Sequence, residues 1–194
     1  MLFIVRHGRT AANALGLLQG RVDNPLDDQG RKQAEQIAEA LGQVDRVVSS
    51  PLRRATQTAE ALGQTPLIDE RWVELDYGDW DARPVADITP QEWAAWREDD
   101  SFCPPRGESL ADLDQRVAAA CEDLIPQAES ENVAVFTHVS PIKSAVGWAL
   151  GVSEQISWRL NVAQAQITRI AIRGNRPILT VFNETAHLET KVLD

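Results

Sequence analysis

The sequence is short of the residues that build disulfide frameworks, metal clusters and membrane spans. It has only two cysteines, and their spacing fits no CxxC pair or zinc site, so we expect Cys103 and Cys121 to be free thiols in a reducing compartment. No apolar run approaches the roughly 20 residues that cross a bilayer. The run at residues 2–5 is also too short for the core of a signal peptide, and Arg6 follows it at once. We therefore expect a cytoplasmic protein that uses no membrane.

Positive charge is scarce as well. The 19 lysines and arginines stand against 29 acidic residues, which gives a formal net charge of −10. This balance argues against nucleic acid as a partner, because such a partner needs a basic face. To bind an anionic small molecule, the protein would need a local cluster of positive groups that overcomes the repulsion from its net negative charge. The acids are spread over expected helices, so they are typical of a solvated surface.

The pattern of apolar residues predicts strands that alternate with helices. Expected strands cover residues 2–6, 44–48, 66–69 and 132–137, followed by a hairpin of 164–172 and 177–182 around Gly174-Asn175. Expected helices cover residues 28–41, 51–62, 90–97, 108–128 and 140–150, with Asp27, Ser50 and Ser140 as the caps of the first, second and fifth. The alternation predicts one α/β domain over residues 1–194, a three-layer α/β/α sandwich with a mostly parallel central sheet and antiparallel additions near the C-terminus.

One stretch departs from this alternation. Residues 79–106 hold Trp80, Trp93 and Trp96, several prolines and a run of acids, so we expect an excursion that covers the ligand site. The three tryptophans either contact the substrate or pack the excursion onto the core, and packing is the favoured interpretation.

Two expected strands end in the same way. The strand at 2–6 runs into Arg6 and His7, and the strand at 132–137 runs into His138. The carboxyl ends of parallel strands share one edge of a sheet, where open α/β sheets bind their ligands. Arg54, at the start of the second helix, and Glu74, after the third strand, are expected at the same edge.

Two arginines, two histidines and one glutamate suit phosphate chemistry. Arginine forks match phosphate oxygens, a histidine can act as a nucleophile, and a glutamate can protonate a leaving oxygen. The alternatives are capping histidines, surface arginines and a turn-capping glutamate. A metal site is disfavoured, because no HExxH helix is present and the arginines would repel a cation. We interpret the third histidine, His187, as structural or exposed.

Five ordered blocks carry a resemblance to a known family. They are RHGRTAAN (6–13), LLQGRVDNPLDDQGRKQA (17–34), VVSSPLRRATQTAEAL (47–62), ELDYGDW (74–80) and RGESL (106–110). Together they resemble the histidine phosphatase superfamily, the phosphoglycerate mutase-like proteins, from residue 2 to about residue 150. The resemblance implies a nucleophilic His7, an acid/base Glu74, and Arg6, Arg54 and His138 around the phosphate, with no cofactor. It also implies substrate-binding roles for Gly8, Thr10, Asn13, Gln19, Gly20 and Val139.

The sequence departs from the family pattern at the second histidine. The family usually has His-Gly-Gly, whereas Val139 and Ser140 follow His138 here, and we expect the Val139 N–H to reach the phosphate all the same. The block HVSPIK (138–143) resembles the acid phosphatase modules related to α-ribazole phosphatase. Lys143 in this block either reaches the substrate or faces solvent. Arg9 stands where relatives often carry glutamate.

The function that these features predict is hydrolysis of small-molecule phosphomonoesters through a phosphohistidine on His7. One alternative is a cofactor-dependent phosphoglycerate mutase, although family mutases are longer between the glutamate and the second histidine. Another is a non-catalytic module that binds a phosphorylated ligand, although such relatives lose the first histidine or the glutamate. Apolar edges near the C-terminal hairpin leave room for a homodimer.

Overall fold

The structure, a computed structural model, describes residues 1–99, 101–152 and 154–188. Its sheet has the strand order β3-β2-β4-β1-β5-β6. The strands are β1 (Leu2–Arg6), β2 (Arg46–Ser49), β3 (Leu67–Ile68), β4 (Val133–Thr137), β5 (Ile167–Arg173) and β6 (Arg176–Glu184). The first four pair in parallel, and the last two join the sheet in antiparallel fashion. The predicted sheet, mostly parallel with antiparallel additions, is therefore confirmed.

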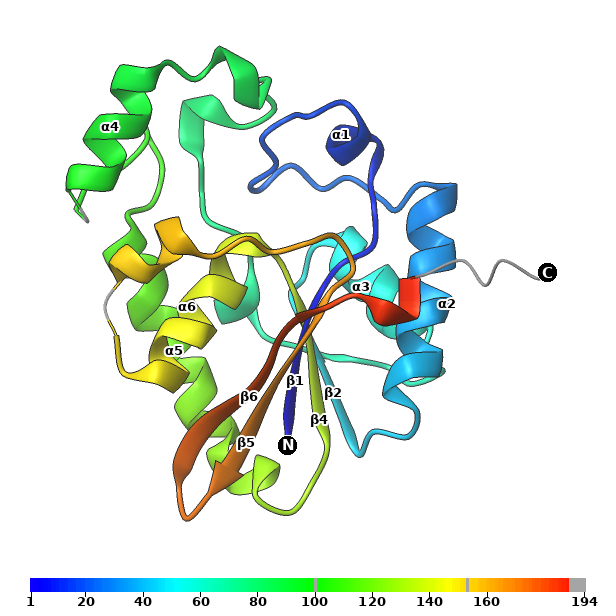
Figure 1. Cartoon of the computed structure of the whole chain (residues 1–194). Coiled ribbons are helices and arrows are strands. Elements are labelled where there is room, and N and C mark those ends of the chain that lie inside the picture. Colours follow the sequence, from blue (N-terminus) through cyan, green and yellow to red (C-terminus); the bar gives the residue numbers. More distant parts are fainter. Residues whose placement is uncertain (100, 153, 189–194) are drawn as a thin grey trace.

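Helices cover both faces of this sheet and reach beyond its carboxyl edge (Figure 1). They are α1 (Ala11–Ala14), α2 (Asp28–Leu41), α3 (Arg53–Glu60), α4 (Pro90–Glu98), α5 (Leu110–Ala128) and α6 (Val139–Leu150). Helices α2 and α3 lie against one face, and α5 and α6 lie against the other, which makes the three predicted layers. The short α1 and the green α4 lie above the ends of the parallel strands in Figure 1.

Strand β1 shows how the layers are built from the sequence. Successive side chains of a strand point to opposite faces. Leu2 and Ile4 accordingly pack in the core with α5 and α6, whereas Phe3 and Val5 pack in the core with α2 and α3. The unbroken apolar run thus anchors β1 from both sides, and Arg6 and His7 begin where that anchor ends.

Local signals fix several boundaries. Asp27 caps α2 by accepting a hydrogen bond from the Gly30 N–H at 2.7 Å, and the helix ends at Gly42, whose φ of 62° suits glycine. The β5–β6 hairpin turns through Gly174 and Asn175, with φ values of 56° and 59°. Positive φ at both turn positions matches the twist of a two-residue hairpin.

The two predicted serine caps are wrong. Helix α3 begins at Arg53 with Leu52 at its cap position, and α6 begins at Val139 with His138 at its cap position; the side chain of neither residue accepts a hydrogen bond from its helix. The Ser50 hydroxyl instead contacts the His138 ring, and the first N–H groups of α6 donate to a carboxylate from elsewhere in the chain. Long-range polar contacts therefore replace the local caps.

The excursion at residues 79–106 holds α4 and packs closely on the rest of the domain. A capping box of Thr89 and Glu92 begins α4. Trp80 and Trp96 are buried in the main core, with ring centroids 5.7 Å apart, which confirms the packing interpretation for these two. Trp93 is only partly buried and lines a pocket.

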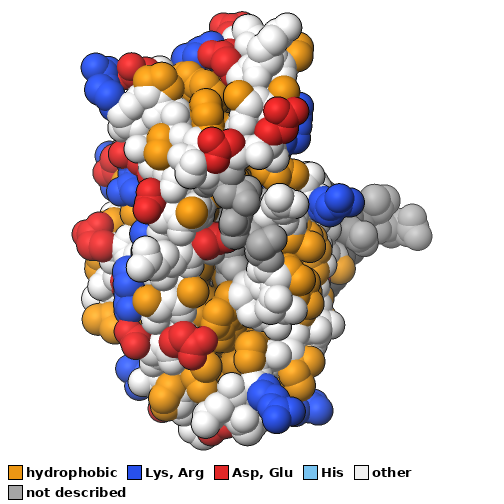
Figure 2. Space-filling view, turned by 90° about the vertical axis from the view of Figure 1, so that its left-hand side faces the viewer, with side chains coloured by type: hydrophobic (Ala, Val, Ile, Leu, Met, Phe, Trp, Pro, Cys, Tyr) orange, Lys and Arg blue, Asp and Glu red, His pale blue; other side chains and the backbone are white. Residues whose placement is uncertain are grey.

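The surface mixes charges of both signs with apolar side chains. On the face seen in Figure 2, red and blue groups are scattered among orange ones without a continuous field of either sign. Cys103 is exposed and Cys121 is buried, and both are free. Within the described part of the chain, no helix is long and apolar enough to span a membrane.

Candidate active site

The parallel pairing of β1 and β4 brings the two strand-end histidines together. Arg6 is in register with Thr137, so His7 and His138 follow paired residues at the same edge. The His7 N–H donates to the Thr137 carbonyl at 3.0 Å, which extends the pairing by one step. The two ring centroids lie 5.1 Å apart at an angle of 57°.

His7 keeps one ring nitrogen free. Its Nδ1 lies 2.7 Å from the Gly8 carbonyl oxygen, which can only accept, so Nδ1 carries the proton and Nε2 carries the lone pair. His7 is 3% exposed and lines a cavity of about 200 Å³ with Arg6, Asn13 and Glu74. Burial and the positive charges of Arg54 and Arg6 hold the pKa of His7 well below its usual value, so the ring is neutral.

His138 uses both ring nitrogens. Its Nδ1 accepts a hydrogen bond from Arg54 Nε at 3.1 Å, so its proton lies on Nε2, which donates to the Ser50 hydroxyl at 2.7 Å. The ring is fully buried, and burial together with the Arg54 charge lowers its pKa well below the usual value. A phosphate oxygen would have to replace one of these partners to reach the ring directly.

Arg54 is a buried cation held by backbone carbonyls. Its Nη1 donates to Val22 O at 2.8 Å, and its Nη2 donates to Gly20 O at 2.7 Å. With the bond to His138, three of the five guanidinium N–H groups are used and two remain. Burial lowers the pKa of Arg54 to about 10, so the group stays charged at neutral pH. Arg53 is exposed, which agrees with placing the phosphate-binding role on its neighbour.

Arg6 brings a half-buried cation to the cavity. Its Nη1 donates to Val162 O at 2.8 Å, while its Nε finds no hydrogen-bond partner in the described part of the chain. Burial lowers its pKa, and the nearby Glu74 acts in the opposite direction. An unpartnered N–H on a half-buried cation is suited to an anionic oxygen.

Glu74 lies at the N-terminus of α6. Its Oε2 accepts from the Val139 N–H at 3.0 Å, and its Oε1 accepts from Ser140 N at 3.1 Å and from Leu75 N at 2.8 Å. The exposed N–H groups and the dipole of a helix N-terminus stabilise a carboxylate. Glu74 thus holds the Val139 N–H that we expect to reach the phosphate, so a phosphate oxygen would have to replace the carboxylate there, and this expectation stays a prediction.

The glycines of the predicted site have structural tasks. The Gly8 N–H donates to Thr58 Oγ1 at 3.0 Å, and a Cβ on Gly8 would collide with the Gly30 carbonyl oxygen. Gly8 therefore permits close packing on α2, and its substrate-binding role stays a prediction. The Gly20 N–H donates to Asp81 Oδ1 at 2.8 Å, so it too is already used.

The polar side chains of the first loop divide between cap and cavity. Thr10 is fully buried, caps α1 with Asn13, and donates through Oγ1 to Gln19 Oε1 at 2.8 Å. Asn13 and Gln19 line the cavity beside His7. Asn13 and Gln19 thus each bond Thr10 within the loop and also line the cavity.

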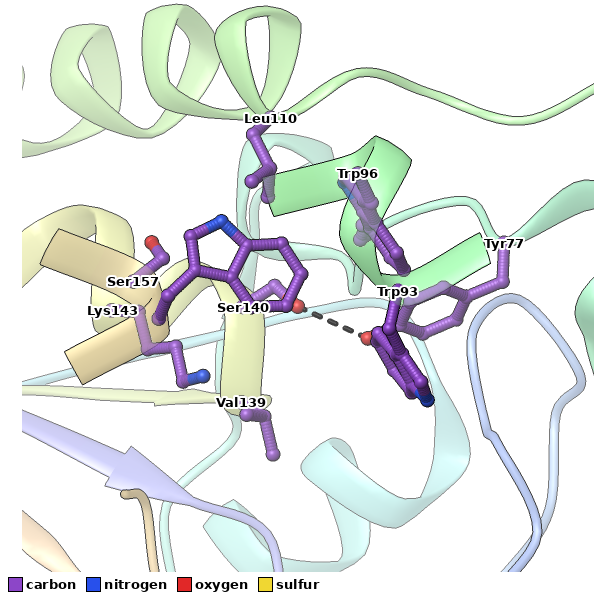
Figure 3. A pocket seen from close by; sticks show the side chains of 10 residues that line it. Tyr77, Trp93, Trp96, Leu110, Val139, Ser140, Lys143 and Ser157 are labelled. Carbon is purple, nitrogen blue, oxygen red and sulfur yellow. Dashed lines mark hydrogen bonds between the residues drawn. The ribbon is translucent and has the colours of Figure 1, made fainter. Parts of the chain in front are cut away.

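Several contributors to the site were missed in the sequence. Tyr77 lines the cavity, and its hydroxyl lies 3.2 Å from Ser140 Oγ (Figure 3). Burial raises the pKa of Tyr77, so its hydroxyl stays neutral. Ser50, which holds His138, and Thr58, which holds Gly8, belong to recognised blocks but gave no separate signal.

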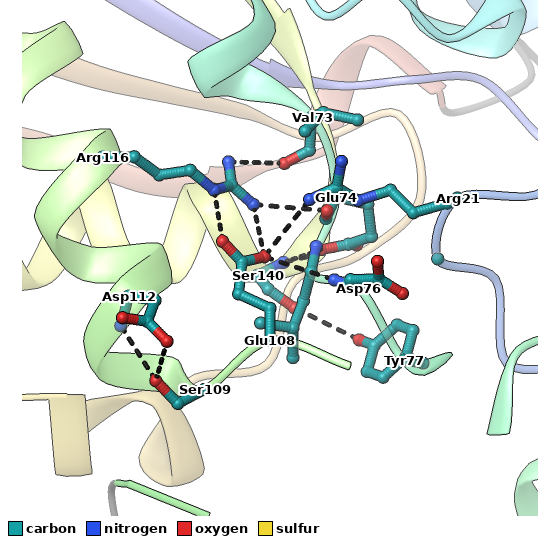
Figure 4. Close-up of polar contacts among 12 residues, drawn as sticks. Arg21, Val73, Glu74, Asp76, Tyr77, Glu108, Ser109, Asp112, Arg116 and Ser140 are labelled. Carbon is teal, nitrogen blue, oxygen red and sulfur yellow. Dashed lines mark hydrogen bonds and ion pairs between the residues drawn. The ribbon is translucent and has the colours of Figure 1, made fainter. Parts of the chain in front are cut away.

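Arg116 fixes the segment that carries Glu74 (Figure 4). Its Nη1 donates to Arg71 O at 2.6 Å and to Val73 O at 2.8 Å, and its Nη2 donates to Glu74 O at 3.3 Å. Glu108 holds the same guanidinium by two bonds of 2.7 and 2.9 Å. A charged residue beside the apolar stripe of α5 carries no signal of this role in the sequence.

Other features bear on what the site can hold. The described residues contain no group of three or more histidines, cysteines or acids arranged to bind a metal ion. His187 lies with its Nε2 2.9 Å from the Ala165 carbonyl and is half-buried, as expected for a structural residue. The cavity is thus lined by the neutral His7, the cation Arg6 and the carboxylate Glu74, and Arg54 lies buried behind it beside His138.

Known proteins resemble this chain over nearly its whole length. The profile of the histidine phosphatase superfamily (branch 1) matches residues 2–185. Phosphoserine phosphatase 1 of Hydrogenobacter thermophilus is 29% identical over 197 residues, covering 96% of this chain and 93% of that protein. A probable phosphoglycerate mutase GpmB of an Enterobacter strain is 31% identical, covering 100% and 97%.

Two solved structures are similar throughout. One is a phosphoserine phosphatase mutant from Entamoeba histolytica in complex with phosphoserine, with a TM-score of 0.89 and 28% identity over 97% of this chain and 98% of that one. The other is a mycobacterial glucosyl-3-phosphoglycerate phosphatase in complex with VO3, with a TM-score of 0.86 and 31% identity over 95% and 98%. Both similarities extend over the whole fold.

Proposed function

The chain belongs to the histidine phosphatase superfamily, and we propose that it is a phosphatase that hydrolyses small-molecule phosphomonoesters through a phosphohistidine on His7. The observation that carries this proposal is the state of His7. Its ring is neutral, its proton is held on Nδ1 by the Gly8 carbonyl, and its Nε2 lies at a cavity beside Arg6 and Glu74. A nucleophile with an oriented lone pair and cations beside it is what phosphoryl transfer needs.

In the first step His7 Nε2 attacks phosphorus in line with the ester oxygen. The nitrogen–phosphorus bond forms as the bond from phosphorus to the ester oxygen breaks, and Glu74 gives its proton to that oxygen. Glu74 must therefore be protonated when the step begins. Arg6, which lines the cavity, stabilises the charge that spreads over the equatorial oxygens, and the buried Arg54 adds its positive charge through its contact with His138.

In the second step water attacks the phosphohistidine. The oxygen–phosphorus bond forms as the bond to Nε2 breaks, Glu74 takes the proton of the water, and inorganic phosphate leaves. The Val139 and Ser140 N–H groups stabilise Glu74 as a carboxylate between the two steps. Glu74 thus alternates between acid and base within one turnover.

The mutase alternative needs a test of its own. The probable phosphoglycerate mutase matches this chain over 212 aligned positions against the chain's 194 residues, so the expectation that mutases are longer stays a prediction and similarity alone does not separate the two reactions. A mutase must protect its phosphohistidine from water, and two adjoining cavities of about 200 and 130 Å³ here leave room for water beside His7. The non-catalytic alternative is disfavoured because His7 and Glu74 are both present in the same cavity.

Phosphorus NMR separates these possibilities. We expect the protein to release inorganic phosphate from a panel of phosphomonoesters and to leave 2- and 3-phosphoglycerate without interconversion. Rapid interconversion with little phosphate release would assign a mutase. Neither reaction, together with no acid-labile phosphate trapped on His7, would assign a binding module.

The remaining predictions concern the protein's surroundings. The proposed reaction runs without a metal ion, because the guanidinium groups supply the positive charge. Cytoplasmic location and the absence of a nucleic-acid partner stay predictions from composition. A homodimer through the C-terminal hairpin also stays a prediction, supported by the exposed side chain of Ile178 on β6.

A further inference from the structure

A second pocket of about 130 Å³ adjoins the cavity beside His7 (Figure 3). The two share Tyr77 and Val139, so a molecule can extend from one into the other. Side chains from α4, α5, α6 and the 154–159 segment meet in its walls. Among the residues that line this second pocket alone, Leu75 and Ser140 serve the chemistry at His7, because each donates its N–H to Glu74.

The walls of this pocket are aromatic. Trp93 and Trp96 stack with an interplanar angle of 2° and a centroid distance of 5.7 Å, and Trp158 meets their rings edge-on at 6.1 and 5.4 Å. The volume is close to the roughly 150 Å³ of an apolar protein cavity that binds benzene. The pocket therefore has room for a single six-membered ring.

Lys143 brings a positive charge to this aromatic pocket. It projects from the first turns of α6, on the same side of the pocket as Val139 and across from Trp93 (Figure 3). It is half-buried, and burial lowers its pKa. Within the described residues its ammonium group makes no hydrogen bond or salt bridge, and its charged neighbours are Glu74, whose charge raises the pKa of Lys143, and Arg6, whose charge lowers it. Of the two interpretations of Lys143 in the sequence, the structure thus favours the one that faces a ligand.

We propose that this pocket binds the alcohol part of the substrate, and that this part is a single ring carrying a carboxylate that pairs with Lys143. The inference rests on the proposed function, because the phosphate of the same molecule must lie at His7. A flat or apolar ring face packs well on the Trp93 side chain. A carboxylate supplies the hydrogen-bonded ion pair that the ammonium group lacks, because the nearby Glu74 is bound by the N–H groups of α6 instead.

Other ring chemistries fit the pocket less well. Aromatic faces also attract cations, but Lys143 repels them, and none of the pocket's lining residues is acidic. A neutral ring would leave the ammonium group without a partner. A negative substituent is therefore the chemistry that the lining selects.

The test compares two esters that differ only in charge, 3-carboxyphenyl phosphate and its neutral isostere 3-carbamoylphenyl phosphate. We expect the wild type to prefer the carboxylate in kcat/KM, and Lys143→Met to lower that preference about tenfold, as the loss of one charge-assisted pair would. Lys32→Met, at an exposed lysine of α2, is the matched control and should leave the preference unchanged. Equal rates for both esters in the wild type, or an unchanged preference in Lys143→Met, would overturn the inference.

A binding measurement separates this inference from the proposed function. Titration calorimetry of the same two esters against His7→Ala reports the preference of the pocket without turnover. Absence of turnover in the wild type with carboxylate-selective binding would overturn only the proposed reaction. Turnover of methyl phosphate with no selectivity between the two ring esters, in rate or in binding, would overturn only the ring-carboxylate subsite.

Discussion

The carboxyl ends of β1 and β4 look alike in sequence and differ in chemistry. Each strand is apolar, each ends on a histidine, and the two are paired neighbours in the sheet. Yet His7 is protonated on Nδ1 and keeps Nε2 free, whereas His138 is protonated on Nε2 and uses both nitrogens. The His7 ring therefore keeps a lone pair for attack on phosphorus. The His138 ring is fixed by its two hydrogen bonds and orients the Arg54 side chain.

The cause of this difference is the segment that succeeds each strand. After β1 the chain runs into a loop, so the Gly8 carbonyl is close enough to accept from its neighbour His7. After β4 the chain enters α6 at once, and His138 sits at the cap position. The free N–H groups of that helix attract Glu74, and the ring is left to partners from α3 and the end of β2.

The largest expected effect separates the two histidines by mutation. His7→Ala should lose at least about 10⁴-fold in kcat, as removal of a nucleophile does, and should trap no phosphoenzyme. His138→Asn should lose about 10²–10³-fold, as removal of one element of transition-state stabilisation does, and should still form phosphohistidine. Rates with 4-nitrophenyl phosphate and acid-quench labelling measure both.

Each outcome can contradict the comparison. Full activity in His7→Ala would remove His7 from the reaction. Labelling lost in His138→Asn but retained in His7→Ala would exchange the two roles. Far-ultraviolet circular dichroism of both variants checks that the fold is intact.

The next effect concerns Glu74, which is bound by the helix that follows β4 and acts as acid and base in the proposed reaction of His7, the residue after β1. Glu74→Gln keeps an oxygen for the α6 N–H groups but loses the proton donor. We expect a loss of about 10²–10⁴-fold with an alkyl phosphate, and a smaller loss with 4-nitrophenyl phosphate, whose leaving group needs less protonation.

The matched control for this variant is Glu70→Gln, at an exposed glutamate near the same segment. It should leave both rates unchanged. An equal loss with the two esters in Glu74→Gln would show that Glu74 acts through its negative charge in the site and does not donate a proton to the leaving oxygen.

Much of the frame is predictable because its signals are local. Asp27 and Gly42 mark the two ends of α2 through contacts with nearby residues of the chain. Gly174 and Asn175 form the hairpin turn through their positive φ angles. The strand-end positions of His7 and His138 follow from apolar runs and parallel topology. The family motifs then attach chemistry to these positions.

The rest depends on partners far away in the sequence. The same Ser-Pro pattern occurs at Ser50 and Ser140, yet neither serine caps its helix. Ser50 instead bonds a histidine 88 residues away, and Arg116 holds the Glu74 segment from 42 residues away. Local propensity cannot reveal such contacts, since they exist only once the sheet has formed.

A smaller effect is expected where His138 is held. Ser50→Ala removes the acceptor of the Nε2 proton and leaves a buried donor unpaired, at a cost of about 1–3 kcal/mol. We expect kcat to fall about tenfold as the ring loses its fixed orientation. Nitrogen-15 NMR should show His7 protonated on Nδ1 in both proteins, and His138 protonated on Nε2 in the wild type.

Ser49→Ala is the control for this variant. Ser49 is equally buried, and its hydroxyl donates to the Ser50 carbonyl rather than to a histidine. It should lose stability to a similar degree without the loss in kcat. Equal activity in the two variants would mean that Ser50 does not position His138.

The smallest effect is on stability rather than on rate. Both histidines are buried and neutral, with a pKa well below the ordinary 6.5, so the unfolded chain takes up protons that the folded chain refuses. The free energy of unfolding should therefore fall as pH drops below about 6.5, by up to about 1.4 kcal/mol per pH unit for each histidine. Carboxylates add their own dependence at lower pH, so the informative quantity is the difference between proteins. Urea unfolding at pH 6.5 and pH 5.5 should show a loss smaller by about 1 kcal/mol in His138→Asn than in the wild type, because one of the two buried bases is gone and the unfolded-state histidine is only half protonated at the start of this interval. An identical loss in both proteins would mean that His138 accepts a proton in the folded state, and the two strand ends would then be alike in charge as well as in sequence.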